Sequence, residues 1–364
     1  MINLNAPINT TTGYGITSTN VWRLLREKTD IALFPIGGNI NLESRDLESI
    51  TQNDVNNSFV PVCKSNPCLK IWHQHDLFNR IGGGKYSALT FFELDSLQPN
   101  EVASLNHPDK ILVASGWAKT ILENHGIPSE NIGIVPLGVD LSVFNPENLK
   151  KATVNPELES NGDKYVFINV GKWEVRKGHD LLVNVFNEAF TEKDNVELWM
   201  VNDNPFLNQQ QINQWHQVYK SSKLGNKIKI FPRLNSHIEL AAVMNKADCG
   251  IYLSRGEGWN NEVMETMALN KPVILTSYSA HTQYSTPHNS YLIDIDSTEP
   301  ANDGIWFKGQ GNWAKIGIPQ IEQAIEYMRE VKNNNIRTNK NGLKTAQKYT
   351  WQNTADTIWK YMTE

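Results

Sequence analysis

The sequence predicts an α/β protein that is built from two Rossmann-like domains. Short apolar runs alternate with helix-forming segments along most of the chain, as is typical of parallel sheets with helical crossovers. The 364 residues also exceed the length of about 250 to 300 residues at which single cores stop growing. Between the two halves, the polar stretch 145–164 has no apolar period, so we interpret it as a linker.

The first half repeats the order strand, loop, helix. Each expected strand is a short apolar run, and glycines, prolines and polar clusters mark the turns between the runs. The expected strands begin at Ile2, Ile31, Leu69, Tyr86, Ile111 and Asn131. A helix is expected after the first of them, and the polar stretch 41–58 is expected to be a helix with exposed ends.

The second half repeats the same pattern. Strands are expected at residues 165–170, 196–201, 228–232, 249–253 and 273–276, because these are buried-type apolar runs. A helix is expected from about Ile238 to Asn245. The tail predicts two helices, over residues 321–331 and 343–362.

The stretch after residue 253 places two carboxylates eight residues apart across a loop-to-helix junction. These are Glu257 on a glycine-rich turn and Glu265, expected about two turns into the helix. Asn260 or Asn261 is the expected N-cap, and the unpaired N–H groups of a helix start attract phosphate. Two acceptors for ligand hydroxyls beside a phosphate cradle suit a sugar nucleotide.

The motif at this junction resembles the Glu-x7-Glu signature of retaining glycosyltransferases with the GT-B fold. It is similar to glycosyltransferase family 4 (glycosyl transferases group 1), which includes phosphatidylinositol mannosyltransferases and sucrose-phosphate synthases. The residues that carry the likeness are Gly256-Glu257-Gly258-Trp259 and the run from Glu265 to Ile274. The segments 113–140 and 171–276 extend the likeness to most of the chain.

The resemblance implies two Rossmann-like domains whose parallel sheets face each other across a cleft, with a C-terminal helix that crosses back to the first domain. The implied boundaries are an acceptor-side domain over 1–150, a linker over 151–164, a nucleotide-sugar domain over 165–345 and the returning helix over 346–364. It also implies that Glu257 holds the donor sugar and that Glu265 holds the ribose. The donor contacts implied around them are Gly258, Trp259, Asn260 and Asn261.

A basic loop follows the strand at 165–170. Lys172 and Lys177 are two cations that can reach a pyrophosphate, although a solvated basic turn is the ordinary alternative. The loop resembles the family's donor-phosphate motif, which favours both lysines and leaves Arg176 as a bystander. The family more usually has Arg at position 172, and Lys keeps the charge without the bidentate fork. The resemblance further places Arg233 and Leu234 at the nucleobase.

The first domain supplies weaker candidates. Gly13 and Gly15 follow the first strand, where the resemblance places a loop that faces the donor phosphates and the acceptor, although a tight turn is the simpler reading. His75, or Asp76 beside it, follows a strand end, where open α/β sheets bind ligands. Many family members have a catalytic His near position 93, whereas this chain has Glu93.

Three other motifs do not fit the sites that they resemble. The segment 79–86 lacks the first glycine and the hydroxyl of a phosphate-binding Walker A loop. Cys63 and Cys68 with the following histidines match no familiar zinc spacing. Asp294 and Asp296 mimic a metal motif of another glycosyltransferase fold, but they come after the donor elements. We therefore expect no metal and no cofactor other than the nucleotide-sugar donor.

Composition excludes several classes of protein. The net charge of -5 and the pI near 6.0 argue against a nucleic-acid binder. The sequence has no apolar run of about 18 residues and no signal-peptide pattern, so a cytoplasmic protein without a transmembrane segment is expected. A peripheral contact with a membrane stays open.

The resulting hypothesis is a retaining, metal-independent transfer of a hexosyl group from a UDP- or GDP-sugar to a glycan, lipid or small-molecule acceptor. Two alternatives remain. One is a non-catalytic sugar-nucleotide or glycan-binding protein of the same fold, which the departures at Lys172 and Glu93 favour. The other is a glycosidase that uses paired carboxylates, but such an enzyme needs no basic loop.

Overall fold

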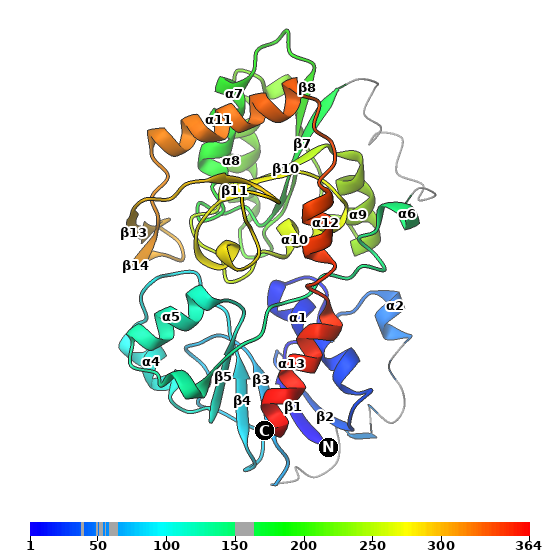
Figure 1. The fold of residues 1–364 in the computed structure, drawn as a ribbon, viewed down its shortest axis with the longest axis vertical. Helices are drawn as coiled ribbons and strands as arrows, with labels where there is room; N and C mark the ends of the chain where they lie inside the picture. Colours follow the sequence, from blue (N-terminus) through cyan, green and yellow to red (C-terminus); the bar gives the residue numbers. More distant parts are fainter. Residues whose placement is uncertain (38–39, 49, 51–53, 55, 58–64, 150–163) are drawn as a thin grey trace. The chain divides into compact units, whose positions relative to one another are not determined.

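The computed structural model describes residues 1–37, 40–48, 50, 54, 56–57, 65–149 and 164–364 (Figure 1). The chain divides into two compact units. Unit 1 comprises residues 1–138 and 349–364, and unit 2 comprises residues 139–348. Within the described ranges each unit contains a six-stranded sheet whose paired strands are all parallel. The predicted α/β class with two Rossmann-like domains is therefore confirmed.

Unit 1 has the strand order β2-β1-β3-β4-β5-β6. Its apolar runs form the strands, because both faces of a parallel sheet are covered by helices. The strands are β1 (Ile2–Ala6), β2 (Ile31–Pro35), β3 (Cys68–Ile71), β4 (Tyr86–Leu89), β5 (Lys110–Val113) and β6 (Ile132–Ile134). The helices are α1 (Gly13–Leu25), α2 (Ser44–Leu47), α4 (Pro99–Leu105), α5 (Gly116–Asn124), the 3-10 turn η1 (Ser129–Asn131) and α13 (Trp351–Thr363).

The predicted helix over residues 41–58 is not found as such. In the part of this stretch that the structure describes, α2 covers Ser44–Leu47, residue 50 is not helical, and residues 54, 56 and 57 are helical again. Residues 49, 51–53, 55 and 58 lie outside the described residues. The stretch has no apolar stripe, and a helix without an apolar face gains little from packing on a sheet.

Unit 2 has the strand order β12-β11-β10-β7-β8-β9. The strands are β7 (Tyr165–Gly171), β8 (Val196–Asn202), β9 (Ile228–Ile230), β10 (Cys249–Tyr252), β11 (Val273–Thr276) and β12 (Tyr291–Ile293), with a separate hairpin of β13 (Thr298–Asn302) and β14 (Lys308–Ala314). The helices and 3-10 turns are α6 (Pro146–Leu149), α7 (His179–Ala189), α8 (Gln209–Lys220), η3 (Gly225–Lys227), α9 (His237–Lys246), α10 (Asn261–Ala268), η4 (Ser279–Gln283), α11 (Ile318–Asn333) and α12 (Lys340–Ala346).

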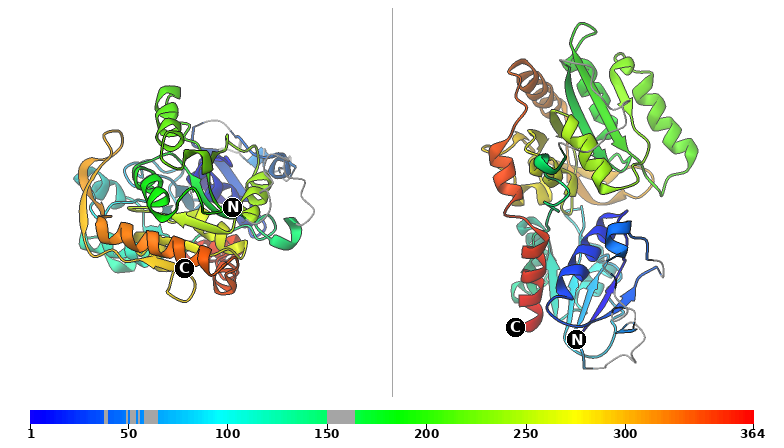
Figure 2. Two further views of the ribbon diagram at one scale, coloured as in Figure 1. Left: turned by 90° about the horizontal axis from the view of Figure 1, so that it is seen from above. Right: turned by 90° about the vertical axis from the view of Figure 1, so that its right-hand side faces the viewer.

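The predicted helix over residues 343–362 is wrong, because the chain forms two helices there. α12 ends at Ala346, and α13 begins at Trp351 with Thr350 as its N-cap, whose hydroxyl accepts from the Asn353 N–H. α13 lies beside α1 (Figure 2), and the Thr354 hydroxyl donates to the carbonyl of Pro136. The last helix therefore belongs to unit 1.

Among the helices of the described residues, none has both the length and the apolar composition that a membrane-spanning segment needs.

Each sheet has one switch point, which lies between two adjacent strands whose following connections run toward opposite ends of the sheet. In unit 1 it lies between β1 and β3, and in unit 2 between β7 and β10. Open α/β sheets bind ligands outside the carboxyl ends of the strands at such points. The fold thus singles out the loop after β7 and the loop after β10 in unit 2.

These two loops meet at Gly178, which gives a stability prediction. Gly178→Ala should lower the free energy of unfolding more than Gly304→Ala. The two glycines have nearly the same left-handed φ, 75 and 74, so alanine meets a similar backbone strain of about 1–2 kcal/mol at each. A Cβ at Gly304 meets open space, whereas at Gly178 it overlaps the carbonyl of Leu253.

The measurement is the urea midpoint of each variant. We expect Gly178→Ala to be less stable than Gly304→Ala by at least about 2 kcal/mol, the range of an overpacked site. Equal midpoints would show that the two loops do not pack as described.

Candidate active site

The switch point of unit 2 is closed by contacts between its two loops. The Arg255 N–H donates to the carbonyl of Arg176 at 2.7 Å. The Arg255 guanidinium donates to both carboxylate oxygens of Asp180, at 2.8 Å each, and to the carbonyl of Val175. The residues that these loops carry are therefore fixed relative to one another.

Glu257 lies at the centre of this junction and is buried. Its Oε1 is 3.0 Å from Lys177 Nζ and accepts from the Ser254 hydroxyl at 2.8 Å, and its Oε2 is 2.8 Å from the Arg176 guanidinium. Burial by itself would raise the pKa of Glu257, but the two adjacent cations outweigh it and hold the pKa well below its ordinary value. The carboxylate is therefore ionised at neutral pH.

Arg176 is part of this cluster, contrary to its expected role as a bystander. It is buried, and besides Glu257 it contacts the carbonyl of Gly256 and Glu174 Oε2, both at 2.7 Å. The sequence signal was present, since Arg176 is one of three cations within six residues. What the sequence did not show is that the side chain turns inward between the two loops.

Lys172 lies at the edge of the cluster. Its side chain is 44% exposed, and its Nζ is 3.0 Å from Glu174 Oε1. Glu174 thus joins Lys172 to Arg176, and burial is again outweighed by these cations, which lower the pKa of Glu174. Glu174 was not expected from the sequence. Lys172 and Lys177 are on one loop, but only Lys177 contacts Glu257.

His179 stabilises the loop after β7 by a hydrogen bond to its backbone. Its Nδ1 accepts from the Glu174 N–H at 3.1 Å, so its Nε2 carries the proton and donates to Asn169 at 2.9 Å. Burial and the nearby charge of Lys177 lower the pKa of His179 to about 3. This neutral histidine is a structural residue that the sequence did not single out.

Glu265 occupies the first helix after the loop. α10 begins at Asn261, so Glu265 lies about one turn into the helix and not two as expected. The carboxylate is buried, and no other residue of the described chain gives it a hydrogen bond or an ion pair that would offset this burial. Burial, together with the neighbouring charge of Glu262, raises the pKa of Glu265 well above its ordinary value.

The expected N-cap residue of α10 has a strained backbone conformation and makes no side-chain capping bond. Asn260 occupies the N-cap position with a left-handed φ of 78, and its side chain donates to His281 Nε2 at 2.9 Å instead of capping the helix. Ser279, with φ 52, accepts from the Glu257 N–H at 2.9 Å. The Oδ1 atoms of Asn260 and Asn261 are buried and have no hydrogen-bond partner among the described residues.

The remaining donor candidates of unit 2 divide into two kinds. Gly258 and Trp259 are buried in the loop, where the carbonyl of Trp259 accepts from the Tyr284 hydroxyl at 2.9 Å. Arg233 and Leu234 follow β9, which is three strands away from β10 in the sheet. Arg233 is exposed and lies 3.4 Å from Asp203. Arg233 and Leu234 thus lie at the carboxyl ends of the strands, as Glu257 does, but not beside Glu257.

The candidates of unit 1 gather at its own switch point around Tyr14. The Tyr14 hydroxyl donates to the carbonyl of Phe91 and accepts from the Phe91 N–H, at 3.0 and 2.9 Å, which joins the glycine loop to the loop that carries Glu93. His73 packs on Tyr14, and the exposed His75 stacks on His73 with ring centroids 5.3 Å apart.

The two glycines of this loop differ. Gly13 is exposed with open space around it, whereas Gly15 lies tightly against the side chain of Asn9. The Gly15 N–H donates to Thr12, the N-cap of α1, so its smallness serves the start of the helix. Of the two cysteines that precede the histidines in the sequence, Cys63 lies outside the described residues and Cys68 is buried in β3.

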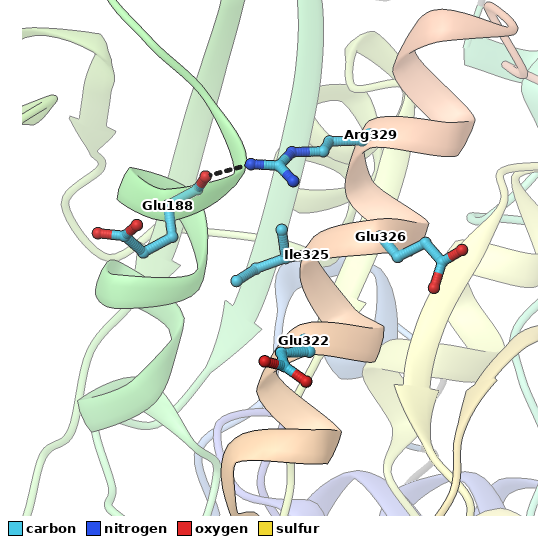
Figure 3. Close-up of a pocket in the computed structure, with 5 residues that line it drawn as sticks. All are labelled: Glu188, Glu322, Ile325, Glu326 and Arg329. Atoms are coloured by element: carbon cyan, nitrogen blue, oxygen red, sulfur yellow. Dashed lines mark hydrogen bonds between the residues drawn. The ribbon is translucent and has the colours of Figure 1, made fainter.

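A pocket of about 490 Å³ lies elsewhere in unit 2, between α7 and α11 (Figure 3). Its lining residues are Glu188, Glu322, Ile325, Glu326 and Arg329. Glu188 is near the C-terminal end of α7, which runs back from the carboxyl edge of the sheet, so the pocket lies toward the opposite edge. It contains none of the candidate residues.

Two comparisons with known sequences found relatives of this chain. Residues 164–304 match the family described as "Glycosyl transferases group 1". An uncharacterized glycosyltransferase of Methanocaldococcus jannaschii is 26% identical over 250 residues, which cover 64% of this chain and 55% of that relative. The chain thus spans about half the length of this relative.

Solved structures share the fold over the whole chain. The Anabaena protein HepE in complex with UDP-glucose has a TM-score of 0.70 at 14% identity, covering 100% of this chain and 99% of that one. The sucrose-phosphate synthase of Thermosynechococcus elongatus has a TM-score of 0.70 at 14% identity, covering 99% and 97%. Most of unit 2 thus matches the glycosyl transferases group 1 family, and the whole chain shares its two-domain fold with these structures.

Proposed function

We propose that this protein is a retaining glycosyltransferase that moves a hexosyl group from a UDP- or GDP-sugar to a glycan, lipid or small-molecule acceptor without a metal. The observation that carries the proposal is the buried Glu257 carboxylate between Arg176 and Lys177 at the switch point of unit 2. A carboxylate for sugar hydroxyls lies there beside cations for a pyrophosphate. The match of residues 164–304 to glycosyl transferases group 1 supports it.

The donor would bind along the carboxyl edge of the sheet. Its ribose hydroxyls would donate to the Glu265 carboxylate, which has no partner in the described chain. Lys177 and Lys172 would bind its pyrophosphate, and the hydroxyls of its sugar would donate hydrogen bonds to Glu257. HepE, which shares the fold, was solved in complex with UDP-glucose, and this supports a nucleotide sugar as the ligand class.

The chemistry that such a site performs is charge stabilisation. Negative charge grows on the β-phosphate as its bond to the sugar breaks, and preorganised cations stabilise that charge more than the ground state. The departing phosphate can take the acceptor proton, so the reaction needs no histidine at position 93. A binding protein without turnover remains the second reading, and an assay of nucleotide release separates the two.

The first test removes one cation. Lys177→Met should lower the rate of transfer by about 10²–10³-fold, the usual effect of losing one preorganised donor. The measurement is release of UDP or GDP from UDP- and GDP-hexoses, with and without chelator, in the presence of a panel of acceptors. Lys177→Arg, which keeps the charge, should retain more activity.

Lys229→Met is the matched control, because Lys229 also pairs with a glutamate of unit 2, Glu197 at 3.1 Å, but lies away from the site. The transfer rate of Lys229→Met should equal that of the wild type. A Lys177→Met protein as active as this control would contradict the proposed role, and loss of the wild-type activity with chelator would contradict metal independence.

The second test concerns Glu265 and nucleotide binding. UDP or GDP at 100 times its dissociation constant should stabilise the wild type by about 2.7 kcal/mol. Glu265→Gln should lose most of this response, because the amide offers one acceptor oxygen where the carboxylate offers two. The measurement is the thermal midpoint with and without each nucleotide. An undiminished response of the variant would remove Glu265 from the ribose site.

The same variant gives a pH dependence without ligand. Burial raises the pKa of Glu265, so above its ordinary value the folded protein holds a proton that the unfolded chain has released, and stability falls as pH rises. Glu265→Gln removes this loss. The melting temperature of the variant should therefore exceed that of the wild type at pH 8, by about 2–4 °C for each kcal/mol of unfolding free energy that the substitution restores in a domain of this size. The difference should shrink toward pH 4.5. A difference independent of pH would contradict the buried, unpaired carboxylate.

A further inference from the structure

A row of aromatic rings crosses the switch point of unit 1 and ends at an exposed histidine. Phe91 packs on Tyr14 with ring centroids 4.8 Å apart, and Tyr14 packs on His73 at 4.5 Å. His73 in turn stacks on His75 at 5.3 Å, and Trp72 meets the edge of the His73 ring at 4.8 Å. We call these five residues the aromatic row. They belong to the segments that follow β1, β3 and β4, so the row lies at the carboxyl ends of the strands, where open α/β sheets bind ligands.

The aromatic row is held on ordered backbone. The Tyr14 hydroxyl is bonded to both backbone groups of Phe91, and the His73 carbonyl accepts from the Asp76 N–H at 3.0 Å, which closes a turn around His75. The other four rings of the row are half-buried, whereas His75 is exposed. His73 covers one face of the His75 ring, with an angle of 18° between the two planes. The exposed imidazole is thus supported in a fixed orientation, so little conformational freedom is lost on binding.

The segments that carry the aromatic row contain carboxylates but no lysine or arginine. These segments are residues 7–13, 72–77 and 90–98, and their carboxylates are Asp76, Glu93 and Asp95. Lys70, which lies in β3, is buried, and its Nζ donates to the carbonyl of Asn79 at 3.1 Å. A phosphate bound on these segments would meet like charges, and none of their own lysine or arginine side chains could offset the repulsion.

The start of α1 is bonded within its own loop. The N–H groups of Thr11 and Thr12 donate to the Asn9 side chain, at 3.1 and 3.0 Å, and the Gly15 N–H donates to the Thr12 hydroxyl at 3.1 Å. These three N–H groups are therefore not available to a phosphate, which a free helix start would attract. Of the two switch points, that of unit 2 carries the cations that a pyrophosphate needs, and that of unit 1 suits a substrate without phosphate.

We propose that the aromatic row is the acceptor subsite and that it binds an unphosphorylated saccharide, with one sugar ring packed on the exposed face of His75. This rests on the proposed function. A sugar ring has apolar C–H faces that pack on an aromatic ring, and hydroxyls that donate to carboxylates. Asp76 follows His75 directly, and its 45% exposed side chain offers such an acceptor. In this role His75 binds the acceptor and transfers no proton.

The test measures binding of the full chain, saturated with UDP or GDP, to printed neutral glycans, to the same glycans bearing phosphate, and to phosphatidylglycerol vesicles. The wild type should bind neutral glycans and should bind their phosphorylated forms more weakly, because like charges suppress wrong partners. His75→Ala should weaken binding to the neutral glycans by at least about ten-fold, as truncation of a central interface side chain does. His75→Trp keeps a ring at this position and should retain the binding.

Phe78→Ala is the matched control. Phe78 is 45% exposed, belongs to the same unit and also packs on a histidine, His107, with ring centroids 4.6 Å apart. His107 comes shortly before β5, so this contact lies toward the amino edge of the sheet and not at the carboxyl edge that carries the aromatic row. Phe78→Ala should bind neutral glycans like the wild type.

Four outcomes would overturn the subsite. They are no binding of neutral glycans by the wild type, tighter binding of phosphorylated glycans or of vesicles, equal binding by His75→Ala and the wild type, or an equal loss in Phe78→Ala. The thermal midpoint with UDP or GDP distinguishes this failure from that of the proposed function, because the nucleotide is proposed to bind unit 2. If a nucleotide still stabilises the wild type, only the subsite is wrong. If neither nucleotide does, the proposed function itself fails.

Discussion

The arrangement of unit 2 depends on one buried carboxylate. An isolated ionised carboxylate is expensive to bury, and Glu257 is tolerated because Arg176, Lys177 and the Ser254 hydroxyl surround it. Arg176 and Lys177 come from the loop after β7, and Glu257 comes from the loop after β10. The ion cluster therefore does more than neutralise a charge, since it ties together the two loops that flank the switch point. A buried pair of this kind is weak evidence for stability, but it fixes the two loops relative to each other.

Around this cluster the chain keeps features that do not favour folding. Asn260 and Ser279 adopt left-handed backbone conformations, and the Oδ1 atoms of Asn260 and Asn261 are buried without a partner in the described chain. Each such feature costs about 1–3 kcal/mol, and such features gather at functional sites. Asn260 and Asn261 closely follow Glu257 in the chain, and the Ser279 hydroxyl accepts from the Glu257 N–H. A ligand that supplies donors there would recover part of that free energy.

The sequence predicted the strands well and the side-chain contacts poorly. The bounds of β1 and β11 agree with the expected runs, because buried parallel strands are continuous apolar segments with clear turns on both sides. The Glu257 loop was predicted from its glycines and its position between strand and helix. Glu174 and Arg176 were missed as members of the cluster, since charged residues on a loop are usually solvated and only tertiary contacts turn them inward. The β13–β14 hairpin was also missed, because its strands are polar and one of them contains Pro300.

Glu257 and Glu265 show how one residue type serves two purposes eight positions apart. Both carboxylates are buried, so burial alone would raise the pKa of each. Two cations reverse the direction at Glu257, whereas at Glu265 the neighbouring Glu262 adds to burial and Lys177 only partly opposes it. The first carboxylate is thus kept ionised by the protein itself. The second lacks such compensation in the described chain, so a ligand that donated a hydrogen bond to Glu265 would favour its ionisation. The helix that carries Glu265 is short, and the ribose contact proposed above would explain why a buried carboxylate without a partner in the described chain is kept there.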